Sequence, residues 1–315
     1  MSGRIVWGFC GTIEEEVEDM NLLSKQAYLI MAHKDDFCFR TLLRLLDDPR
    51  NDIFIHMDKK NRSYDETTIS EYIKKSKVYH VNRTNVTWGG YSMINAELLL
   101  LKKAVDVGSY QHYHLLSGQD LPIKTQDQII AFFTKNGGKE FIQFEKEFYG
   151  CQDRTQYYNF LQEKIGRSRK PILRWINNYL IAVERKLHIE RNKDVRFQKG
   201  ANWFSITDGF ARYVVEREAW IKKTFKQTIC SDEIFLQTLL IASPYLDNLY
   251  HKAFDDDMHA IMRFIDWNRG GPYTFRRSDF DELCESEMLF ARKFDAQVDA
   301  DIIKSMLNKL LGESQ

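Results

Sequence analysis

The tripeptide Ser231-Asp232-Glu233 contains a candidate for proton transfer. It precedes the apolar run IFLQTLL, which predicts a helix, and Ser231 or Asp232 would cap that helix. Glu233 would then lie in the first turn, where the helix dipole holds its carboxylate and half-buried aromatic surroundings can raise its pKa toward neutral. A carboxylate held in this way can serve as a general base. The alternative is that the tripeptide is only a capping box.

Asp58 stands at the end of the alternating segment IFIHMDKK, which predicts a strand. A carboxylate at a strand end can accept hydrogen bonds from the N–H and hydroxyl groups of a nucleotide base or ribose. Taken alone, the position more often indicates a turn or a helix cap. The sequence around Asp58 therefore allows both a nucleotide contact and a turn or cap role.

Cations and one aromatic residue are interleaved with turn residues near the end of the chain. A subset that converges on one point could neutralise a diphosphate without any metal ion, whereas the others would be ordinary surface charges. The residues concerned are Arg263, Trp267, Arg269, Arg276, Arg277, Arg292 and Lys293.

Several motifs that bind nucleotides or metal ions in other enzymes are missing from the sequence. The sequence has no GxGxxG, GxxxxGK[ST] or HExxH motif, so a dinucleotide oxidoreductase, a P-loop enzyme and a zincin are not supported. Asp-x-Asp patterns occur at 255–257 and 299–301, and such a pair could hold a divalent ion. Both follow the strands expected to bind a nucleotide, so solvated or capping roles are favoured. We therefore expect no metal cofactor.

The elements that must position these residues alternate in type. QAYLIMAH (26–33), DIFIHM (52–57) and KVYHV (77–81) predict strands, and 37–48 and 65–76 predict helices. This β-α-β-α-β order is typical of a parallel sheet, which binds ligands beyond the carboxyl ends of its strands. The loops after His33 and Met57 are therefore expected to line the site.

The rest of the chain continues a mixed α/β pattern. The predicted helices are 91–107, 208–224, 231–242 and 279–290, and the predicted strands are 113–117, 140–145, 197–207 and 262–267. We expect a possible extension at 1–19 and one domain over 20–315. Within it, 26–145 would form a nucleotide-binding half, 150–195 a helical basic insertion, and 196–300 an acceptor and catalytic half.

Composition excludes several classes of protein. The 315 residues are 43% hydrophobic, which supports a substantial core and excludes a disordered or fibrous chain. Lys and Arg number 45, as do Asp and Glu, so no overall field favours nucleic acid. The five cysteines form no CxxC pair, and we find no signal peptide or membrane anchor. We expect a cytoplasmic protein.

The segment 164–199 is strongly basic. It has eleven basic and three acidic residues, hence a net charge of +8 in a chain of zero net charge. Trp175, Ile176, Leu180, Val183 and Leu187 recur at helical spacing. The segment could rest on an anionic membrane at its inner face or receive a lipid-linked diphosphate acceptor. The alternative, slightly favoured, is that the apolar stripe packs on the domain.

Several segments together resemble a known family. They are AYLIMAHKD, IFIHMDKK, WGGYSMINAELLLLKKA, YHLLSGQDLPIKT, KGANWFSIT, CSDE, RFIDW and LFARKFD, in that order over residues 26–295. In order and spacing they are similar to the core-2/I-branching β-1,6-N-acetylglucosaminyltransferases and peptide O-xylosyltransferases, which are the family 14 glycosyltransferases. LSGQDLPIKT and LFARKFD are the most specific pieces.

The resemblance implies a GT-A type fold, a UDP-sugar donor, a glycan acceptor, inversion at the anomeric carbon and no metal requirement. By the same resemblance, Asp58 would contact the uridine and Trp88 would lie beside the uracil. Glu233 would be the catalytic base. Lys293 would contact the diphosphate. Trp267, and with it Asp120 of the LSGQDLP segment, would belong to the acceptor site.

The sequence departs from the family pattern at two points. The segment that carries the arginine partner of Lys293 is shortened, so Arg269, Arg276 and Arg292 compete for that role. The cysteines also do not reproduce the lumenal disulfides of the family. Together with the resemblance, these departures imply a cytosolic bacterial relative that builds a surface polysaccharide. A catalytically idle UDP-sugar or glycan-binding module, or a sugar-nucleotide hydrolase, remains an alternative.

Overall fold

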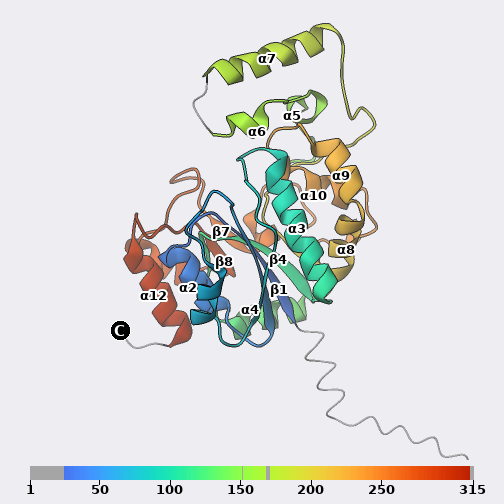
Figure 1. Cartoon of the computed structure of the whole chain (residues 1–315). Helices are drawn as coiled ribbons and strands as arrows, with labels where there is room; N and C mark the ends of the chain where they lie inside the picture. The colour runs from blue at the N-terminus through green and yellow to red at the C-terminus, as the bar shows by residue number, and fades with distance from the viewer. Residues whose placement is uncertain (1–24, 151, 168–170, 313–315) are drawn as a thin grey trace, which may run out of the picture.

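The computed structural model describes residues 25–150, 152–167 and 171–312 (Figure 1). A five-stranded sheet at its centre has the strand order β3-β2-β1-β4-β6, in which β6 alone is antiparallel to its neighbour. The strands are β1 (Gln26–Ala32), β2 (Asn51–Met57), β3 (Lys77–His80), β4 (His112–Ser117) and β6 (Ser205–Thr207). The expected α/β fold with a mostly parallel central sheet is confirmed.

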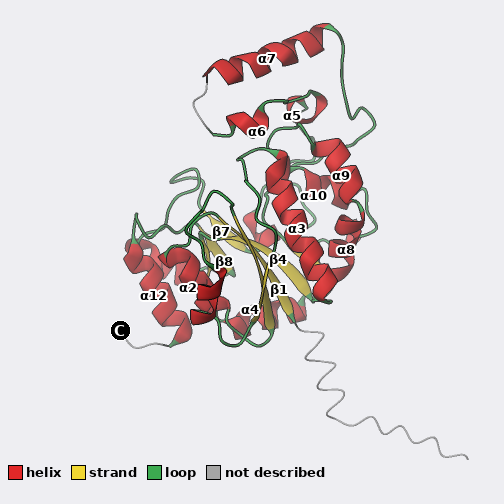
Figure 2. Cartoon of the chain, viewed as in Figure 1, coloured by secondary structure: helices red, strands yellow, loops and turns green. Residues whose placement is uncertain are grey.

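Helices cover both faces of this sheet (Figure 2). Successive side chains of a strand point to opposite faces, so Tyr28 and Ile30 of β1 join one core while Ala27 and Leu29 join the other. The first core contains residues of α2 (Phe37–Leu46), α4 (Gln126–Lys135) and α12 (Ala300–Leu311). The second contains residues of α3 (Tyr91–Val107), α8 (Asp208–Glu216), α9 (Glu218–Phe225) and α10 (Phe235–Ile241).

A second, three-stranded sheet has the order β5-β8-β7. Its strands are β5 (Asp120–Pro122), β7 (Arg263–Ile265) and β8 (Phe290–Arg292). The buried guanidinium of Arg263 donates to the carbonyl oxygens of Leu115 (3.2 Å) and Phe204 (2.7 Å), and so ties β7 to the central sheet. Burial lowers the pKa of Arg263 to about 10.

Two predicted strands are wrong in extent. Residues 140–145 make only isolated bridges, from Glu140 to Leu249 and from Phe141 to Ser205. The segment 197–207 is a strand only in β6. A side chain takes the place of a strand partner here, because Oε1 of Gln143 accepts the backbone N–H of Ala201 at 2.6 Å. Alternation alone cannot distinguish such a loop from a strand.

Some predicted helices are shorter than expected or divided. Residues 65–76 contain only a 3-10 helix over Glu66–Glu71, which Asp65 caps. The closing helix α11 is Phe280–Glu285, and β8 begins where the prediction placed the end of that helix. The remaining 3-10 helices are η2 (Ser231–Glu233), η3 (Leu246–Asn248), η4 (Met258–Ile261) and η5 (Arg277–Asp279).

The predicted helical insertion consists of α5 (Asp153–Gln156), α6 (Gln162–Ile165) and α7 (Pro171–Lys186). Figure 1 shows it set apart from the sheet, beyond the end of α3, with α7 as its outermost element. The possible extension at 1–19 lies outside the described residues. None of the helices in the described ranges has both the length and the apolar character needed to cross a bilayer.

Candidate functional site

A cavity of about 460 Å³ opens beyond the carboxyl ends of β1 and β2. This is the place that the β-α-β pattern predicts for a ligand. Asp58 is 5% exposed and lies in its wall, together with residues from the loops after β1 and β2 and from the loop after β8. The lining residues are His33, Lys34, Asp35, Asp36, Asp58, Lys60, Asn61, Ser63, Ala296 and Gln297.

Asp58 also has the turn role that its position at a strand end favours. Its Oδ1 accepts the backbone N–H of Lys60 at 2.9 Å, and its Oδ2 lies 3.2 Å from Nζ of Lys60. The N–H of Asp58 donates to the carbonyl oxygen of Ala32, which continues the pairing of β1 with β2. These contacts fix the carboxylate at the cavity wall, so both interpretations of Asp58 hold in the structure.

The loops after β1 and β8 meet at one side of this cavity. Nζ of Lys34 lies 3.3 Å from Oδ2 of Asp295, and Gln119 donates to the same oxygen at 3.3 Å. His33, at the cavity wall, has a lowered pKa because burial and then the nearby charge of Lys34 disfavour its protonated form. Lys34 therefore contributes a positive charge to the wall of the cavity.

Lys293 and Arg292 follow one another at the end of β8. Burial lowers the pKa of Lys293, and the positive charges of Arg292 and Arg167 lower it further. An anion bound near Lys293 would relieve this repulsion. Arg292 is the competing arginine that the structure places beside Lys293.

Asp120 holds Arg292 in place. Its Oδ1 lies 2.6 Å from Nη1 of Arg292, and its Oδ2 accepts the N–H of Ser117 at 2.7 Å. Asp120 is 2% exposed. The expectation that Asp120 contacts an acceptor is therefore at odds with its burial, and its contacts indicate a positioning role instead. Arg292 also lies over the ring of Trp203, with its Cζ 4.5 Å from the centroid.

The two other candidate arginines, Arg269 and Arg276, make contacts away from Lys293. Arg269 donates to Asp279 and Glu282 at 2.8 Å each, and it also binds Asp266. An arginine that is held by three carboxylates has little capacity left for a diphosphate. The expectation that Arg269 binds UDP therefore lacks support in the geometry. Arg276 is the N-cap residue of η5 and takes part in its capping box.

Arg167 is a cation that the sequence did not single out for the donor site. It lies in the insertion, and its Cζ is 4.8 Å from the ring centroid of Trp88. Trp88 is 43% exposed. The sequence placed Arg167 only within a basic segment, and no spacing rule connects it to Lys293. The fold of the insertion brings it there.

The loop of Trp88 also reaches the candidate base. The N–H of Cys230 donates to the carbonyl oxygen of Gly89 at 2.9 Å, and Cys230 directly precedes η2. Glu233 is the last residue of η2, and its carboxylate is partly exposed. Nη1 of Arg154 in α5 lies 2.9 Å from Oε2 of Glu233. A cation from the insertion thus orients the carboxylate of Glu233.

The predicted cap at Ser231-Asp232-Glu233 is wrong. Neither η2 nor α10 has a side-chain cap, and both Ser231 and Asp232 are buried. Among the residues that the structure describes, the hydroxyl of Ser231 and Oδ1 of Asp232 find no hydrogen-bond partner. The side chains point into the core because η2 is a separate short helix before α10, and not the first turn of α10.

Asp232 lies in a buried acidic pocket behind Glu233. Burial and then the charge of Glu233 raise the pKa of Asp232 to about 7. Burial and the neighbouring Asp232 raise the pKa of Glu97 as well. With its amide nitrogen facing both groups, Asn202 donates to Oε1 of Glu97 at 3.0 Å and to the carbonyl oxygen of Asp232 at 3.2 Å. Both carboxyl groups are expected to be protonated over much of the acidic range.

The predicted acceptor residue Trp267 is 54% exposed and follows the β7 strand, next to Asp266. Asp266 accepts the N–H groups of Asn268 at 2.8 Å and Arg269 at 3.0 Å. The turn is therefore fixed while the indole of Trp267 stays open to solvent. An exposed indole on a rigid turn can stack on a sugar ring, which has an apolar face.

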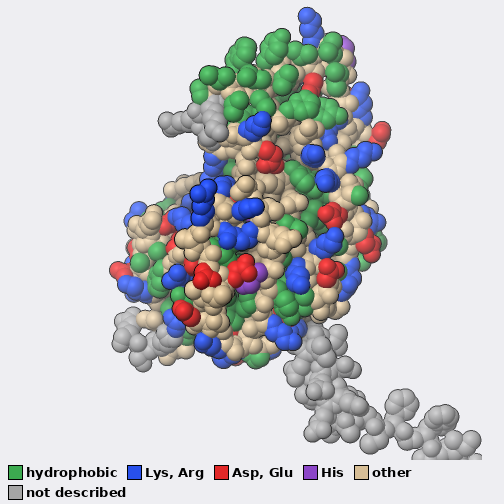
Figure 3. Space-filling view, in the orientation of Figure 1, with side chains coloured by type: hydrophobic (Ala, Val, Ile, Leu, Met, Phe, Trp, Pro, Cys, Tyr) green, Lys and Arg blue, Asp and Glu red, His purple; other side chains and the backbone are tan. Residues whose placement is uncertain are grey.

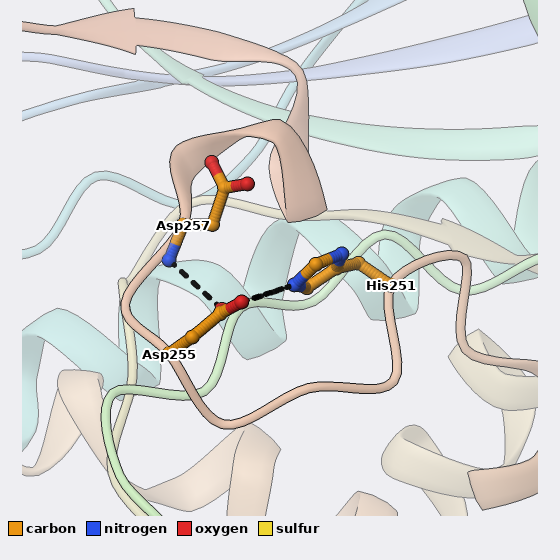
Figure 4. A group of neighbouring side chains, drawn as sticks. All are labelled: His251, Asp255 and Asp257. Atoms are coloured by element: carbon orange, nitrogen blue, oxygen red, sulfur yellow. Dashed lines mark hydrogen bonds and ion pairs between the residues drawn. The ribbon is translucent and has the colours of Figure 1, made fainter.

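None of the Asp-x-Asp segments at 255–257, 279–281 and 299–301 lines the cavity. Away from the cavity, one ligand atom each of His251, Asp255 and Asp257 lies within 4.8 Å of the others, so these three residues could hold a metal ion (Figure 4). Asp257 also caps η4 and lies 2.7 Å from Nδ1 of His259. Asp299 caps α12 through the N–H groups of Asp301 and Ile302. The capping roles that the sequence favoured are confirmed.

Comparison with known proteins agrees with these features. The family model described as Core-2/I-Branching enzyme matches residues 26–288. The chain belongs to this family. The match includes the Asp58 loop, the Trp88 loop and η2, whereas Arg292 and Lys293 lie just beyond its end.

Curated relatives are xylosyltransferases. Xylosyltransferase 2 of Bos taurus is 24% identical over 308 residues, which cover 91% of this chain and 33% of the relative. Xylosyltransferase 1 of Homo sapiens is 24% identical over 282 residues, which cover 82% of this chain and 27% of the relative. The chain thus spans about a third of the length of these relatives. A solved structure of mouse xyloside xylosyltransferase 1 in its apo form has 11% identity and a TM-score of 0.36, and covers 84% of this chain and 96% of that one.

Proposed function

We propose that this protein is a glycosyltransferase that moves a sugar of the N-acetylglucosamine or xylose type from a UDP donor to a hydroxyl of a glycan acceptor. Its family and its xylosyltransferase relatives support sugar transfer. We further propose that the reaction inverts the anomeric carbon and uses no metal ion. A glycan that becomes part of a surface polysaccharide, free or linked to a lipid, is the proposed acceptor.

One observation carries this proposal. The loop of Trp88 contacts Arg167 of the insertion and Cys230 next to η2, and Lys60 of the cavity wall donates to the carbonyl oxygen of Val86 in the same loop. In the proposal, this loop lies between a carboxylate for the nucleoside, cations for the diphosphate and a carboxylate base for the acceptor hydroxyl. In the proposal, Asp58 accepts hydrogen bonds from the uridine, and the ring of Trp88 lies beside the uracil.

The leaving group gathers negative charge as the bond between the sugar and UDP breaks. In the proposal, Lys293 and Arg167 stabilise the diphosphate, and Arg292 supports them from its ion pair with Asp120. Because Arg292 is already paired, its contribution is weaker than that of the two other cations. This arrangement would replace the divalent ion that many enzymes use for the same charge.

Glu233 is the proposed general base. It takes the proton of the acceptor hydroxyl as that oxygen forms a bond to the anomeric carbon, while the bonding electrons of the old glycosidic linkage leave with UDP. Arg154 orients the carboxylate through their 2.9 Å contact. Trp267 would stack on the acceptor sugar, and Asp120 would act only by positioning Arg292.

The decisive experiment is a screen of UDP-sugars by saturation-transfer NMR, followed by mass spectrometry of products on candidate glycans. The proposal expects one UDP-sugar to bind and to yield a glycan that is heavier by one sugar residue. Donor loss without acceptor would instead identify a sugar-nucleotide hydrolase.

A catalytically idle UDP-sugar-binding module is the second candidate. The observation in its favour is the contact of Arg154 with Glu233, because the guanidinium occupies an oxygen that would otherwise be open to the acceptor hydroxyl. This candidate expects UDP binding with no turnover on any acceptor tested. The Arg154→Lys variant distinguishes it, since a base that is only oriented by Arg154 stays active when another cation takes that place.

A further inference from the structure

The outer face of α7 is apolar although it faces away from the core. Ile172, Trp175 and Tyr179 recur at the i, i+3, i+7 spacing of one helix face, and they are 73%, 67% and 57% exposed. Figure 3 shows hydrophobic side chains gathered over α7 at the outer edge of the molecule. The sequence favoured a stripe that packs on the domain, and for Trp175 this expectation is wrong.

The inner face of α7 explains why the outer face is free. Asn177 accepts the N–H of Leu161 at 3.2 Å, and Glu184 accepts the N–H of Tyr158 at 2.9 Å. Both side chains are buried. Polar contacts thus fasten α7 to the rest of the insertion, and Ile172, Trp175 and Tyr179 are left on the opposite side.

The two outer aromatic rings form a fixed pair. The centroids of Trp175 and Tyr179 lie 5.8 Å apart, with an interplanar angle of 13°. Exposed aromatic rings of this size cost free energy in water, so a stable exposed pair indicates a surface that is covered in use. Trp and Tyr are also the residues enriched where a protein meets the headgroup region of a bilayer.

The basic residues near α7 indicate which partner would cover its outer face. Nine Lys or Arg and three Asp or Glu lie among the described residues of 164–199, whereas the whole chain has zero net charge. Of these cations, Arg167 lies at Trp88, Arg185 pairs with Asp153 and Lys199 pairs with Glu145, so only part of the excess charge can face a partner of α7. Lys186 extends this basic character to the end of α7, and Leu187 beside it is 60% exposed. A second copy would bring two basic segments face to face, which repel each other. An anionic bilayer attracts the cations and accepts the aromatic rings.

We propose that the outer face of α7, formed by Ile172, Trp175 and Tyr179 with Lys186 and Leu187 at its end, docks this protein on an anionic lipid bilayer. The opposite side of the insertion contacts the loop of Trp88 through Arg167. Docking would therefore hold the candidate donor site facing a bilayer, within reach of an acceptor carried by a lipid. The docking itself does not depend on the proposed transfer reaction.

The test is co-sedimentation of the full chain with vesicles of phosphatidylcholine alone or phosphatidylcholine with phosphatidylserine, at low and high salt. The wild type is expected to bind only the anionic vesicles, and binding is expected to weaken at high salt. Trp175→Ala with Tyr179→Ala should lower the affinity about tenfold or more, since apolar burial contributes to such attachment. Lys186→Gln should lower it about fivefold, which corresponds to about 1 kcal/mol per cation near the surface.

Trp220→Ala is the matched control, because Trp220 is also an exposed indole but lies on α9 outside the insertion. It is expected to bind vesicles as the wild type does. Thermal unfolding and UDP binding of all variants should stay unchanged, which separates loss of docking from loss of fold or of donor binding.

Three outcomes overturn the proposal. They are equal binding to neutral and anionic vesicles, a Trp175/Tyr179 double variant that sediments like the wild type, and no vesicle binding at all. Sedimentation velocity on the same samples identifies the alternative occupant. A dimer that the double variant loses, without vesicle binding, would show that α7 pairs with a second copy.

Discussion

Nη1 of Arg154 lies 2.9 Å from Oε2 of Glu233, so a helix of the insertion holds the candidate base. This contact joins two segments that lie 79 residues apart in the sequence. It makes the insertion part of the candidate active site, and not only an appendage of the domain.

Glu233→Gln is expected to lower the rate of transfer by about 10²–10⁴-fold, because the amide cannot take a proton at neutral pH. UDP affinity should stay within about twofold, since the amide keeps the shape of the side chain. Turnover and isothermal titration measure the two quantities. Glu216→Gln, at an exposed position of α8, is the matched control. Equal turnover of Glu233→Gln and wild type would remove Glu233 from the mechanism.

Lys293→Ala and Arg167→Ala should each weaken UDP binding by about 10–100-fold, as expected when a charge-assisted hydrogen bond to a diphosphate is lost. Turnover should fall as well, because the same charge stabilises the leaving group. Lys304→Ala removes a cation on the surface of α12 and should leave both quantities unchanged. If Arg167→Ala binds UDP normally while Lys293→Ala does not, the insertion does not contribute to the donor site.

Turnover is expected to survive removal of divalent ions. The Asp-x-Asp segments at 255–257 and 299–301 cap helices or bind histidine, and the one at 279–281 holds Arg269. The cations at Arg292 and Lys293 can neutralise a diphosphate. Activity measured with excess EDTA should therefore equal activity without it. Loss of activity that Mn²⁺ restores would contradict the metal-free proposal, and Asp58 and Asp255 would then be the ligands to test.

The pH dependence of stability should include Asp232. Its pKa is about 7 in the folded protein and 3.8 as the ordinary value, so between these pH values the unfolded chain releases a proton that the folded chain keeps. Stability therefore falls as the pH rises from about 4 to about 7. Asp232→Asn should weaken this fall and be more stable than the wild type at pH 8, by on the order of 2 kcal/mol.

Urea unfolding at pH 5 and pH 8 measures this effect. Asp247→Asn is the matched control, because its side chain is fully exposed and should not change the difference between the two pH values. A pH dependence of stability that is equal in Asp232→Asn and the wild type would show that Asp232 is ionised in the folded protein. Residual pH dependence in Asp232→Asn is expected from Glu97 and Glu140 and, with the opposite sign, from His112 and His114.

The sequence predicts those parts of the fold that depend on the spacing of apolar residues within one segment. The helix 91–107 was predicted with the bounds that α3 has, because its apolar residues recur at helical spacing and Gly90 precedes it. The strand ends at His33 and Asp58 were placed correctly because parallel strands bury both faces and read as apolar runs. Both ends line the cavity.

What the sequence missed depends on contacts between distant segments. Arg167 and Arg154 look like ordinary charges of a basic insertion until the fold places them against Trp88 and Glu233. Asp120 looked like an acceptor contact, but only the pairing of β5 with β8 reveals that it holds Arg292. The false strand at 140–145 has the same cause, since its backbone bonds to several separate segments, at Ser205, Asn248 and Lys199, and not to one continuous strand.

The start of α3 depends on a residue that the chain supplies much later. Gly90 offers no side-chain cap, and the carboxylate of Glu163 in the insertion accepts the N–H and the hydroxyl of Ser92 at 2.8 Å each. A Cβ on residue 90 would come within 2.6 Å of that carboxylate, so any other residue there would push the side chain of Glu163 away from Ser92. On a ribosome, α3 would therefore emerge with the N–H of Ser92 open to water. This N–H finds its partner only after a further 71 residues, up to Glu163, have been synthesised, so we expect it to gain protection from hydrogen exchange later than the interior of the helix.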